Sequence, residues 1–293
     1  MKHLKRSAAG YTYETERSNE AKVSLREWVK WLAPPILTDL YRRARGGLRS
    51  ENLWQGIYPT YGDVPVSGSG HDDDRVVSSA VAHATKLVSS SRQYGSIPTE
   101  VTAEHSLLPL LVSVICSASG GARVLDFGGG MGFAYLHLVS SILGCDDLDY
   151  HIVEREAVCS AATRLFGADS RVHFHSSLPE DLRGVDVVHI SSALQYVEHY
   201  ADVLRRLCAY RAQYVLFVKL SAGDTPTYAT QQINLPGTTL AYWFINIREV
   251  IALMSQEGYA LTFKGALERE YDQHNFPSEY RLGRACNLLF SRK

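Results

Sequence analysis

The feature of this sequence that most constrains its fold is an alternation of apolar runs with amphipathic stretches, which begins at Ala122. Runs rich in Val, Ile, Leu and Phe predict strands over 123–127, 149–154, 172–175, 185–190, 214–218, 260–267 and 287–290. Helices are predicted over 133–143, 156–167 and about 200–210, and a capping box opens another at Asn246, with Glu249 three residues on. Strands that alternate with helices predict an α/β, Rossmann-like sheet of seven mostly parallel strands with helices on both faces. No helical pattern separates the last two strands, so we expect them to pair as a C-terminal antiparallel hairpin.

The chain before this alternation is predicted to hold helices and long loops. Apolar spacing predicts helices over 77–88 and about 102–117, the second ending at Gly120-Gly121. The run His71–Asp74 directly precedes the first helix, where acidic residues cap a helix more readily than they hold a metal ion. Residues 51–70 are aromatic and rich in turn residues, which predicts a loop.

Charge divides the chain unevenly. Residues 1–50 hold 11 Lys and Arg against 5 Asp and Glu, and the other 243 residues hold 19 against 26, so a segment of net charge +6 precedes a part of net charge −7. This basic segment fits a helical extension packed on the main domain, or an arm for peripheral contact with a membrane surface or an anionic substrate. We therefore expect a helical and loop N-terminal extension, 1–100, that covers the substrate, and a main domain, 101–293.

The composition excludes several classes of protein. Hydrophobic residues make up 45% of the chain, which is enough for a substantial core. The net charge of −1 lacks the basic excess of a nucleic-acid binder, so no nucleic-acid partner is expected. No stretch reaches the roughly 18–20 apolar residues that span a bilayer. The five cysteines are scattered without C-x-x-C spacing, which favours reduced thiols in a soluble, cytoplasmic protein.

The turn after the first strand of the alternation carries the strongest functional signal. It reads Asp126-Phe-Gly-Gly-Gly-Met-Gly132, a D-x-G-x-G-x-G pattern. A dinucleotide site needs the pattern G-x-G-x-x-G. The position of the third glycine is occupied by Phe133 in one register and by Tyr135 in the other, so the pattern fails in both. Glycines let the backbone approach a ligand closely, and an acid beside them suits a cationic group such as the ammonium and sulfonium of S-adenosylmethionine.

The segment Val124–Gly132 resembles motif I of the class I S-adenosylmethionine-dependent methyltransferases, and the resemblance extends over about 122–293. The chain also resembles a bacterial methyltransferase family with a Trp-x-Gly-x-Tyr-Pro segment upstream of motif I, matched here by Trp54–Pro59. In the class I methyltransferases an acidic residue at the end of the second strand holds the ribose. Glu154 occupies this position here, at the end of the predicted strand 149–154. The resemblance implies S-adenosylmethionine as cofactor, bound by Asp126, Phe127, Gly128, Gly129, Gly130, Glu154, Ser176, Ser177 and Ser191. Asp126 would act through water or its backbone on the ammonium, and Ser176 and Ser177 would lie near the adenine.

The methyl acceptor is less well defined. The segment after the fourth strand, Ser191–Tyr196, lacks the Asn/Asp-Pro-Pro-Tyr/Phe pattern of enzymes that methylate base or Gln amino groups. We expect O- or N-methylation of a small molecule or glycan, with Tyr58, Tyr196 and Lys219 near the substrate. His199 is the candidate general base, although a structural His at this place remains the alternative.

Two other functions remain open: a non-catalytic relative that binds S-adenosylmethionine or a partner protein, and a nucleotide-dependent oxidoreductase, which the failed third glycine disfavours. No metal site is expected, because the loops at this edge do not supply the several carboxylates that a cation-assisted enzyme needs.

Overall fold

The computed structural model describes residues 53–70, 74–94, 106–142, 147–235 and 238–293, which belong to one compact unit, Asn52–Lys293. The basic segment 1–50 and the residues His71, Asp72 and Asp73 lie outside the described residues. What the sequence predicts for these two segments therefore stays a prediction.

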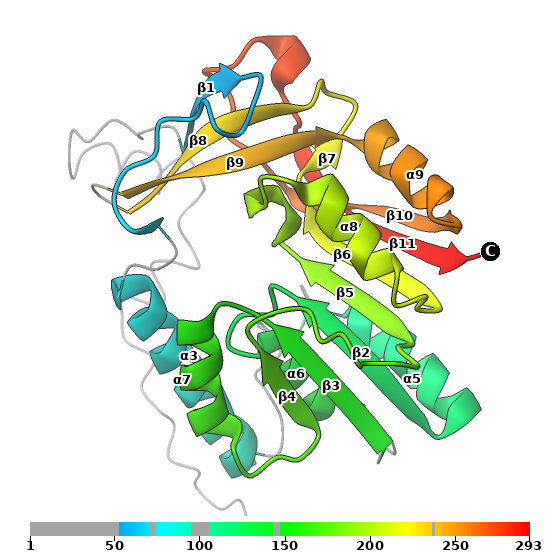
Figure 1. Ribbon diagram of the computed structural model, residues 1–293. Helices are drawn as coiled ribbons and strands as arrows, with labels where there is room; N and C mark the ends of the chain where they lie inside the picture. Colours follow the sequence, from blue (N-terminus) through cyan, green and yellow to red (C-terminus); the bar gives the residue numbers. More distant parts are fainter. Residues whose placement is uncertain (1–52, 71–73, 95–105, 143–146, 236–237) are drawn as a thin grey trace, which may run out of the picture. The chain divides into compact units, whose positions relative to one another are not determined.

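A mixed sheet of seven strands forms the centre of this unit (Figure 1). Its bounds are β2 Gly121–Phe127, β3 Asp147–Val153, β4 Val172–His175, β5 Val187–Ser191, β6 Tyr214–Leu220, β10 Tyr259–Glu270 and β11 Arg284–Arg292. The strands lie in the order β10, β11, β6, β5, β2, β3, β4, and those from β6 to β4 are parallel. β11 pairs antiparallel with both β6 and β10. The predicted fold class and the C-terminal hairpin are confirmed.

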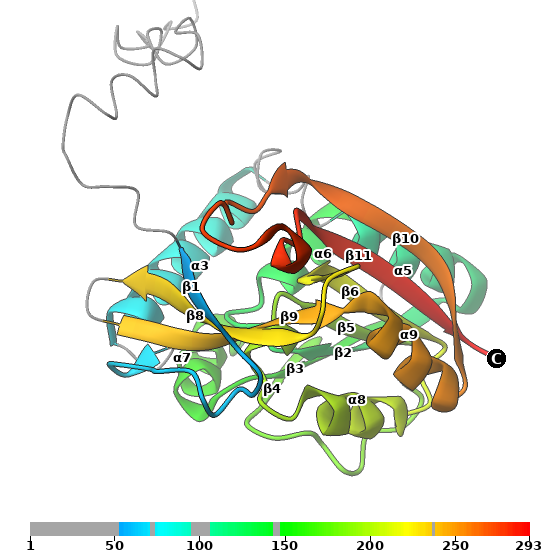
Figure 2. The ribbon, with the colours of Figure 1, turned by 90° about the horizontal axis from the view of Figure 1, so that it is seen from above.

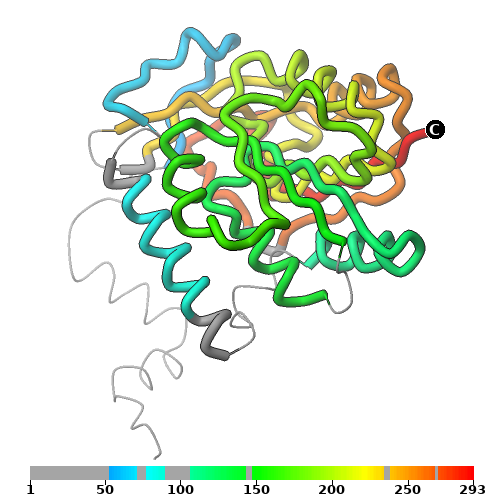
Figure 3. Tube along the Cα trace, turned by 60° about the horizontal axis from the view of Figure 1, so that its bottom comes forward, coloured from blue at the N-terminus to red at the C-terminus, as the bar shows by residue number. Residues whose placement is uncertain are grey.

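Helices cover both faces of the sheet (Figure 2). Their bounds are α3 Asp74–Tyr94, α5 Leu107–Ser119, α6 Phe133–Ser141 and α7 Glu156–Phe166 on one face, and α8 Tyr200–Cys208 and α9 Ile247–Gln256 on the other. Helix α3 lies beside α7 (Figure 3). Successive strand residues point to opposite faces, so Val124 joins the core under α5 and α6 while Leu125 joins the core under α8 and α9.

A second sheet of four strands, in the order β1, β8, β9, β7, was not predicted. It consists of β1 Trp54–Tyr58, β7 Ala222–Gly223, β8 Tyr228–Leu235 and β9 Thr238–Asn246. The loop expected over 51–70 is therefore wrong at β1, and β8 and β9 pair antiparallel as a hairpin. Within β1, Gly56 has a φ of +77°, and the Tyr58 ring occupies the space that a Gly56 side chain would need. Aromatic side chains from the second sheet and the segment that follows β10 pack together as Trp54, Tyr228, Tyr242, Phe244 and Phe276.

Helix ends follow the predicted capping signals in two places. Gly120 ends α5 with a φ of +82°, and its N–H donates to the Cys116 carbonyl. Asn246 begins α9, and its side chain accepts a hydrogen bond from the Arg248 N–H at 2.9 Å. The capping box is incomplete, however, because the Asn246 N–H donates to the Thr227 hydroxyl instead of to Glu249.

The cysteines agree only in part with the sequence analysis. Cys159, Cys208 and Cys286 are free and buried, as expected. Cys116 is disulfide-bonded, so the expectation of reduced thiols throughout is wrong at this residue. Among the helices of the described residues, none has the length and apolar character needed to cross a membrane.

Candidate functional site

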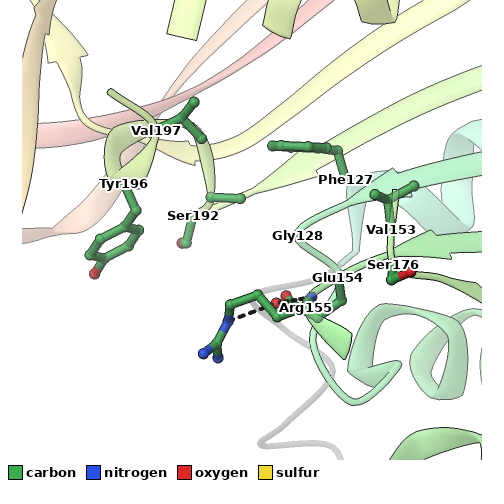
Figure 4. A pocket seen from close by; sticks show the side chains of 10 residues that line it. Phe127, Gly128, Val153, Glu154, Arg155, Ser176, Ser192, Tyr196 and Val197 are labelled. Carbon is green, nitrogen blue, oxygen red and sulfur yellow. Dashed lines mark hydrogen bonds and ion pairs between the residues drawn. The ribbon is translucent and has the colours of Figure 1, made fainter. Parts of the chain in front are cut away.

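A cavity of about 410 Å³ opens at the carboxyl ends of the central parallel strands (Figure 4). The chain proceeds from β2 to β3 and β4 on one side and then continues with β5 on the other side of β2, so the cavity lies where the strand order reverses. Ligands of open α/β sheets bind at such a point. The lining residues come from the ends of β2, β3, β4 and β5: Phe127, Gly128, Val153, Glu154, Arg155, Ser176, Ser192, Ala193, Tyr196 and Val197.

The glycine-rich turn forms one wall of this cavity. Gly128, Gly130 and Gly132 have φ values of +70°, +56° and +76°, which is the left-handed region that favours glycine. The Gly128 N–H donates to the Val153 carbonyl at 2.8 Å, so the turn is fixed to the end of β3. A Cβ on Gly128 would lie 2.4 Å from the Ala193 Cβ, whereas a Cβ on Gly130 would meet no protein atom within 4 Å. Gly128 thus allows close packing against Ala193, whereas the backbone at Gly130 is left open.

Asp126 lies beneath the turn and is fully buried. Its Oδ2 accepts a hydrogen bond from the Tyr150 hydroxyl at 2.8 Å, and its Oδ1 is 2.8 Å from His189 Nδ1. A Cβ on Gly129 would lie 2.5 Å from Asp126 Oδ2, so the carboxylate fills the space directly below this glycine. Burial, with the nearby Asp126 charge, raises the pKa of the Tyr150 hydroxyl well above its usual value. The hydroxyl therefore stays protonated and continues to donate.

Glu154 follows β3 and its carboxylate lines the cavity. Its Oε2 accepts from the Gly130 N–H at 3.2 Å, and its Oε1 accepts from the Arg155 N–H at 2.9 Å. The Arg155 guanidinium also lies 3.3 Å from Oε1, an ion pair that Figure 4 shows beside the opening. The acid is thus linked directly to the glycine-rich turn.

The opposite wall follows β5. Ser192 has a φ of +52°, which is uncommon for a non-glycine residue and suggests a position held by its surroundings. Its N–H donates to the Val218 carbonyl at 3.0 Å. The Tyr196 hydroxyl donates to Gln232 Oε1 at 2.9 Å, and burial raises the pKa of Tyr196 to about 12. Tyr196 is therefore a neutral hydrogen-bonding group at neutral pH and cannot act as a general base there.

The structure brings together five of the residues predicted for the site. Phe127, Gly128, Glu154, Ser176 and Tyr196 line the cavity. The lining also includes Ser192 and Ala193 of the segment Ser191–Tyr196, which the resemblance implies at the methionine end, and three residues that sequence reasoning missed, Val153, Arg155 and Val197. Their only sequence signal is that they adjoin Glu154 or belong to the segment after β5.

Other predicted residues do not line the cavity: Asp126, Gly129, Gly130, Ser177, Ser191, Tyr58, Lys219 and His199. His199 is exposed and precedes α8, where its carbonyl accepts hydrogen bonds from the first turn. Lys219 is half-buried with a φ of +56°, and its N–H donates to Asn287 Oδ1. Gly130 still touches the site through its hydrogen bond to Glu154.

Comparison with known proteins gives a limited result. No protein-family model matches the sequence, and no curated protein matches it either. An uncharacterised protein from Burkholderia thailandensis is 16% identical with a TM-score of 0.47, over 78% of this chain and 95% of that one. The 1,6-didemethyltoxoflavin-N1-methyltransferase from Burkholderia thailandensis, crystallised with S-adenosylhomocysteine, is 18% identical with a TM-score of 0.44, over 85% and 98%. The magnesium protoporphyrin IX methyltransferase from Synechocystis, also with S-adenosylhomocysteine, is 13% identical with a TM-score of 0.44, over 75% and 100%. We therefore argue function from this chain's own site.

Proposed function

We propose that this protein is an S-adenosylmethionine-dependent methyltransferase that acts on a small-molecule or glycan acceptor by O- or N-methylation. One observation carries the proposal. The Glu154 carboxylate and the glycine-rich turn are joined by a hydrogen bond at a cavity that lies where the strand order reverses. A turn of the D-x-G-x-G-x-G type and an acid at the end of the next strand are the two features on which the resemblance to this superfamily rests.

The residues at the cavity fit the proposed cofactor. A carboxylate has about four acceptor positions on its two oxygens. The Oε2 atom of Glu154 accepts only the 3.2 Å bond from Gly130 among the hydrogen bonds of the described residues, so it retains room to accept from a ribose hydroxyl. The open space around Gly130 would let a ligand approach the backbone, and the volume of about 410 Å³ lies within the range of small-ligand sites. The dinucleotide alternative still lacks its third glycine.

The chemistry that the cofactor supplies when bound is an electrophilic methyl group on a sulfonium. The chain's task is then to position an acceptor atom in line with that group and to exclude water. Tyr196 is suited to orient the acceptor, because its neutral hydroxyl lies on the wall opposite Glu154 and is held by Gln232 of β8. The hydroxyl of its neighbour Tyr61 lies 2.8 Å from the Tyr196 carbonyl oxygen and 3.0 Å from the Ala241 carbonyl oxygen and shares its proton between them, which ties this wall to the second sheet.

The identity of a general base stays a prediction. His199, the candidate base, lies outside the residues that line the cavity, and Tyr196 is protonated at neutral pH. We propose that the acceptor atom is one that loses its proton to water or has none to lose, and that His199 has a structural role before α8. The net positive charge of the segment 1–50 would attract an anionic acceptor, such as a phosphate-linked glycan. The same charge also fits contact with a membrane surface.

The experiment begins with binding. Titration calorimetry on the full chain should show S-adenosylhomocysteine binding and no binding of NADH, with Glu154→Ala weakening the first. The matched control is Glu156→Ala, because Glu156 is a neighbouring acid in the first turn of α7 that does not line the cavity. NADH binding in place of S-adenosylhomocysteine would overturn the cofactor assignment.

Transfer of a labelled methyl group to a metabolite pool then separates an enzyme from a non-catalytic binder, and binding without transfer to any acceptor would favour the latter.

A further inference from the structure

Four polar side chains gather on one face of the edge of the seven-stranded sheet, away from the cavity lining. Asp149 and His151 belong to β3, and His173 and His175 belong to β4, the edge strand. Each pair is spaced by two residues, so all four side chains point to the same face. Their neighbours in sequence, such as Tyr150 and Phe174, point to the other face and join the apolar core.

This face is accessible because of how the chain returns from β4. The eleven residues from 176 to 186 lead to β5 as a loop, and no helix lies between these two strands in this fully described stretch. A parallel crossover usually contains a helix that covers the sheet. The side chains of His151, Asp149 and His173 are accordingly 12%, 31% and 44% exposed, so solvent reaches a partly buried cluster.

Three atoms of this cluster converge. Asp149 Oδ1 lies 2.9 Å from His151 Nε2 and 3.2 Å from His173 Nε2, and the three atoms all lie within 4.8 Å of one another. His151 Nε2 is a buried ring nitrogen, and Asp149 Oδ1 is its close polar neighbour. Ligands bound at 2.0–2.1 Å in a tetrahedron are about 3.3 Å apart, close to the two short distances here.

We propose that Asp149, His151 and His173 form a binding site for a single divalent transition-metal ion of the zinc type, which would join the edge strand β4 to β3. Two imidazoles and one carboxylate match the ligand types that Zn²⁺ prefers, with water completing the tetrahedron. None of the three proposed ligands lines the cofactor cavity, and the proposal does not rest on methyl transfer. It departs from the sequence analysis, which expected no metal site.

The surrounding contacts support this assignment, because metal ligands are normally oriented by a second set of hydrogen bonds. His151 Nδ1 lies 2.9 Å from His175 Nε2, which leaves the Nε2 atom of His151 for the metal. Arg123 Nε donates to Asp149 Oδ2 at 2.7 Å, which leaves Oδ1 for the metal. The Arg123 guanidinium also donates to the Arg183 carbonyl in the loop that follows β4, and so links this loop to the site.

The test is a calorimetric titration of the full chain, prepared without an oligohistidine tag and stripped with a chelator, with ZnCl₂. We expect one Zn²⁺ per chain and at least a hundredfold weaker binding in both His173→Ala and Asp149→Asn. Arg123→Gln, which removes the hydrogen bond to Asp149 and the one to the Arg183 carbonyl but no proposed ligand, should weaken binding by about 10–100-fold. Cobalt(II) should give the visible absorption of a four-coordinate site in the parent chain and lose it in His173→Ala.

The matched control is His274→Ala, because His274 is an exposed histidine 3.9 Å from Asp272 and outside the cluster. Its Zn²⁺ affinity should equal that of the parent chain. His173 lies on an edge strand with 44% of its side chain exposed, so its variant should fold, which circular dichroism can verify. The absence of stoichiometric binding, or its persistence in folded His173→Ala and Asp149→Asn, would overturn the proposal.

Discussion

Gly128 and Gly130 provide a matched pair of substitutions that separates backbone strain from steric contact. Both have left-handed backbones, with φ values of +70° and +56°, and they lie two residues apart in the same turn. Their surroundings differ, because a Cβ at Gly128 would lie 2.4 Å from the Ala193 Cβ and one at Gly130 would meet no protein atom within 4 Å. Replacing each by Ala should therefore give clearly unequal losses of stability.

The expected magnitudes follow from these two terms. A left-handed backbone costs a non-glycine residue roughly 1–2 kcal/mol, and this term applies to both variants. Overpacking typically costs about 1–3 kcal/mol, and this term applies only to Gly128→Ala, since the opposing atom belongs to a short side chain that cannot rotate away. Gly130→Ala should therefore lose about 1–2 kcal/mol in the free energy of unfolding and Gly128→Ala about 2–5 kcal/mol.

Urea unfolding of both variants measures these free energies, and the double variant Gly128→Ala, Ala193→Gly isolates the contact. Removing the Ala193 Cβ should recover the stability lost to overpacking, while the cost of backbone strain remains. Calorimetry with S-adenosylhomocysteine adds a second measurement, in which Gly130→Ala should weaken binding although it folds well. Equal destabilisation by Gly128→Ala and Gly130→Ala, or no recovery in the double variant, would refute the reasoning.

Three further predictions concern the acidic residues Glu154, Asp126 and Asp169. Glu154→Ala should weaken S-adenosylhomocysteine binding by roughly 1.5–3 kcal/mol in calorimetry, and Glu154→Gln by less, because one acceptor oxygen survives. Asp126→Ala should lower the free energy of unfolding by about 3–5 kcal/mol because it leaves buried partners unpaired, whereas Tyr150→Phe, which removes one hydrogen bond to the carboxylate, should cost roughly 1.5–3 kcal/mol. Hydrogen bonds from Arg171 hold the pKa of Asp169 at about 2, below its usual 3.8, so its stabilisation is complete above pH 3.8 and is lost as the pH falls toward 2. Asp169→Asn should therefore be less stable than the parent chain at pH 7 but equally stable near pH 2, as measured by urea unfolding at each pH.

The central sheet could be predicted because its strands are recognisable by local signals. β5 is buried on both faces and reads as a nearly continuous apolar run, as central parallel strands do. Gly120 and Asn246 marked helix ends through their own backbone and side-chain chemistry. The element boundaries moved by one to three residues in several places, because pairing with a neighbouring strand extends a strand beyond its apolar run.

The second sheet could not be predicted because its strands bury polar side chains that are satisfied by distant partners. In β8, Thr230 is fully buried and its hydroxyl donates to the Gly56 carbonyl at 2.7 Å. Gln232 is buried and accepts from Tyr196. A sequence shows the polar residue but not its partner, which is 174 residues away for Thr230 and 36 residues away for Gln232, so β8 resembles a loop. The apolar run in β9 was visible, but its pairing partner was not.

The metal cluster was missed for a related reason. Its signals are two short patterns, Asp149-x-His151 and His173-x-His175, each of which is unremarkable alone. Only the parallel register of β3 and β4, in which His151 pairs with His173, places the two patterns side by side. Residues that share a face on neighbouring strands form a cluster only once the register is known, which the sequence does not give.

The site also shows how one motif contains residues with separate tasks. Asp126 and Glu154 are both acids at the ends of neighbouring strands, but Asp126 is fully buried and Glu154 faces the cavity. The two oxygens of Asp126 are engaged by Tyr150 and His189, so an effect of Asp126 on a ligand has to pass through the turn that it supports. Glu154 can act on a ligand directly. Substitution of Asp126 should consequently change stability and binding together, whereas substitution of Glu154 should change binding more than stability, and this difference is what separates a supporting residue from one that holds the ligand.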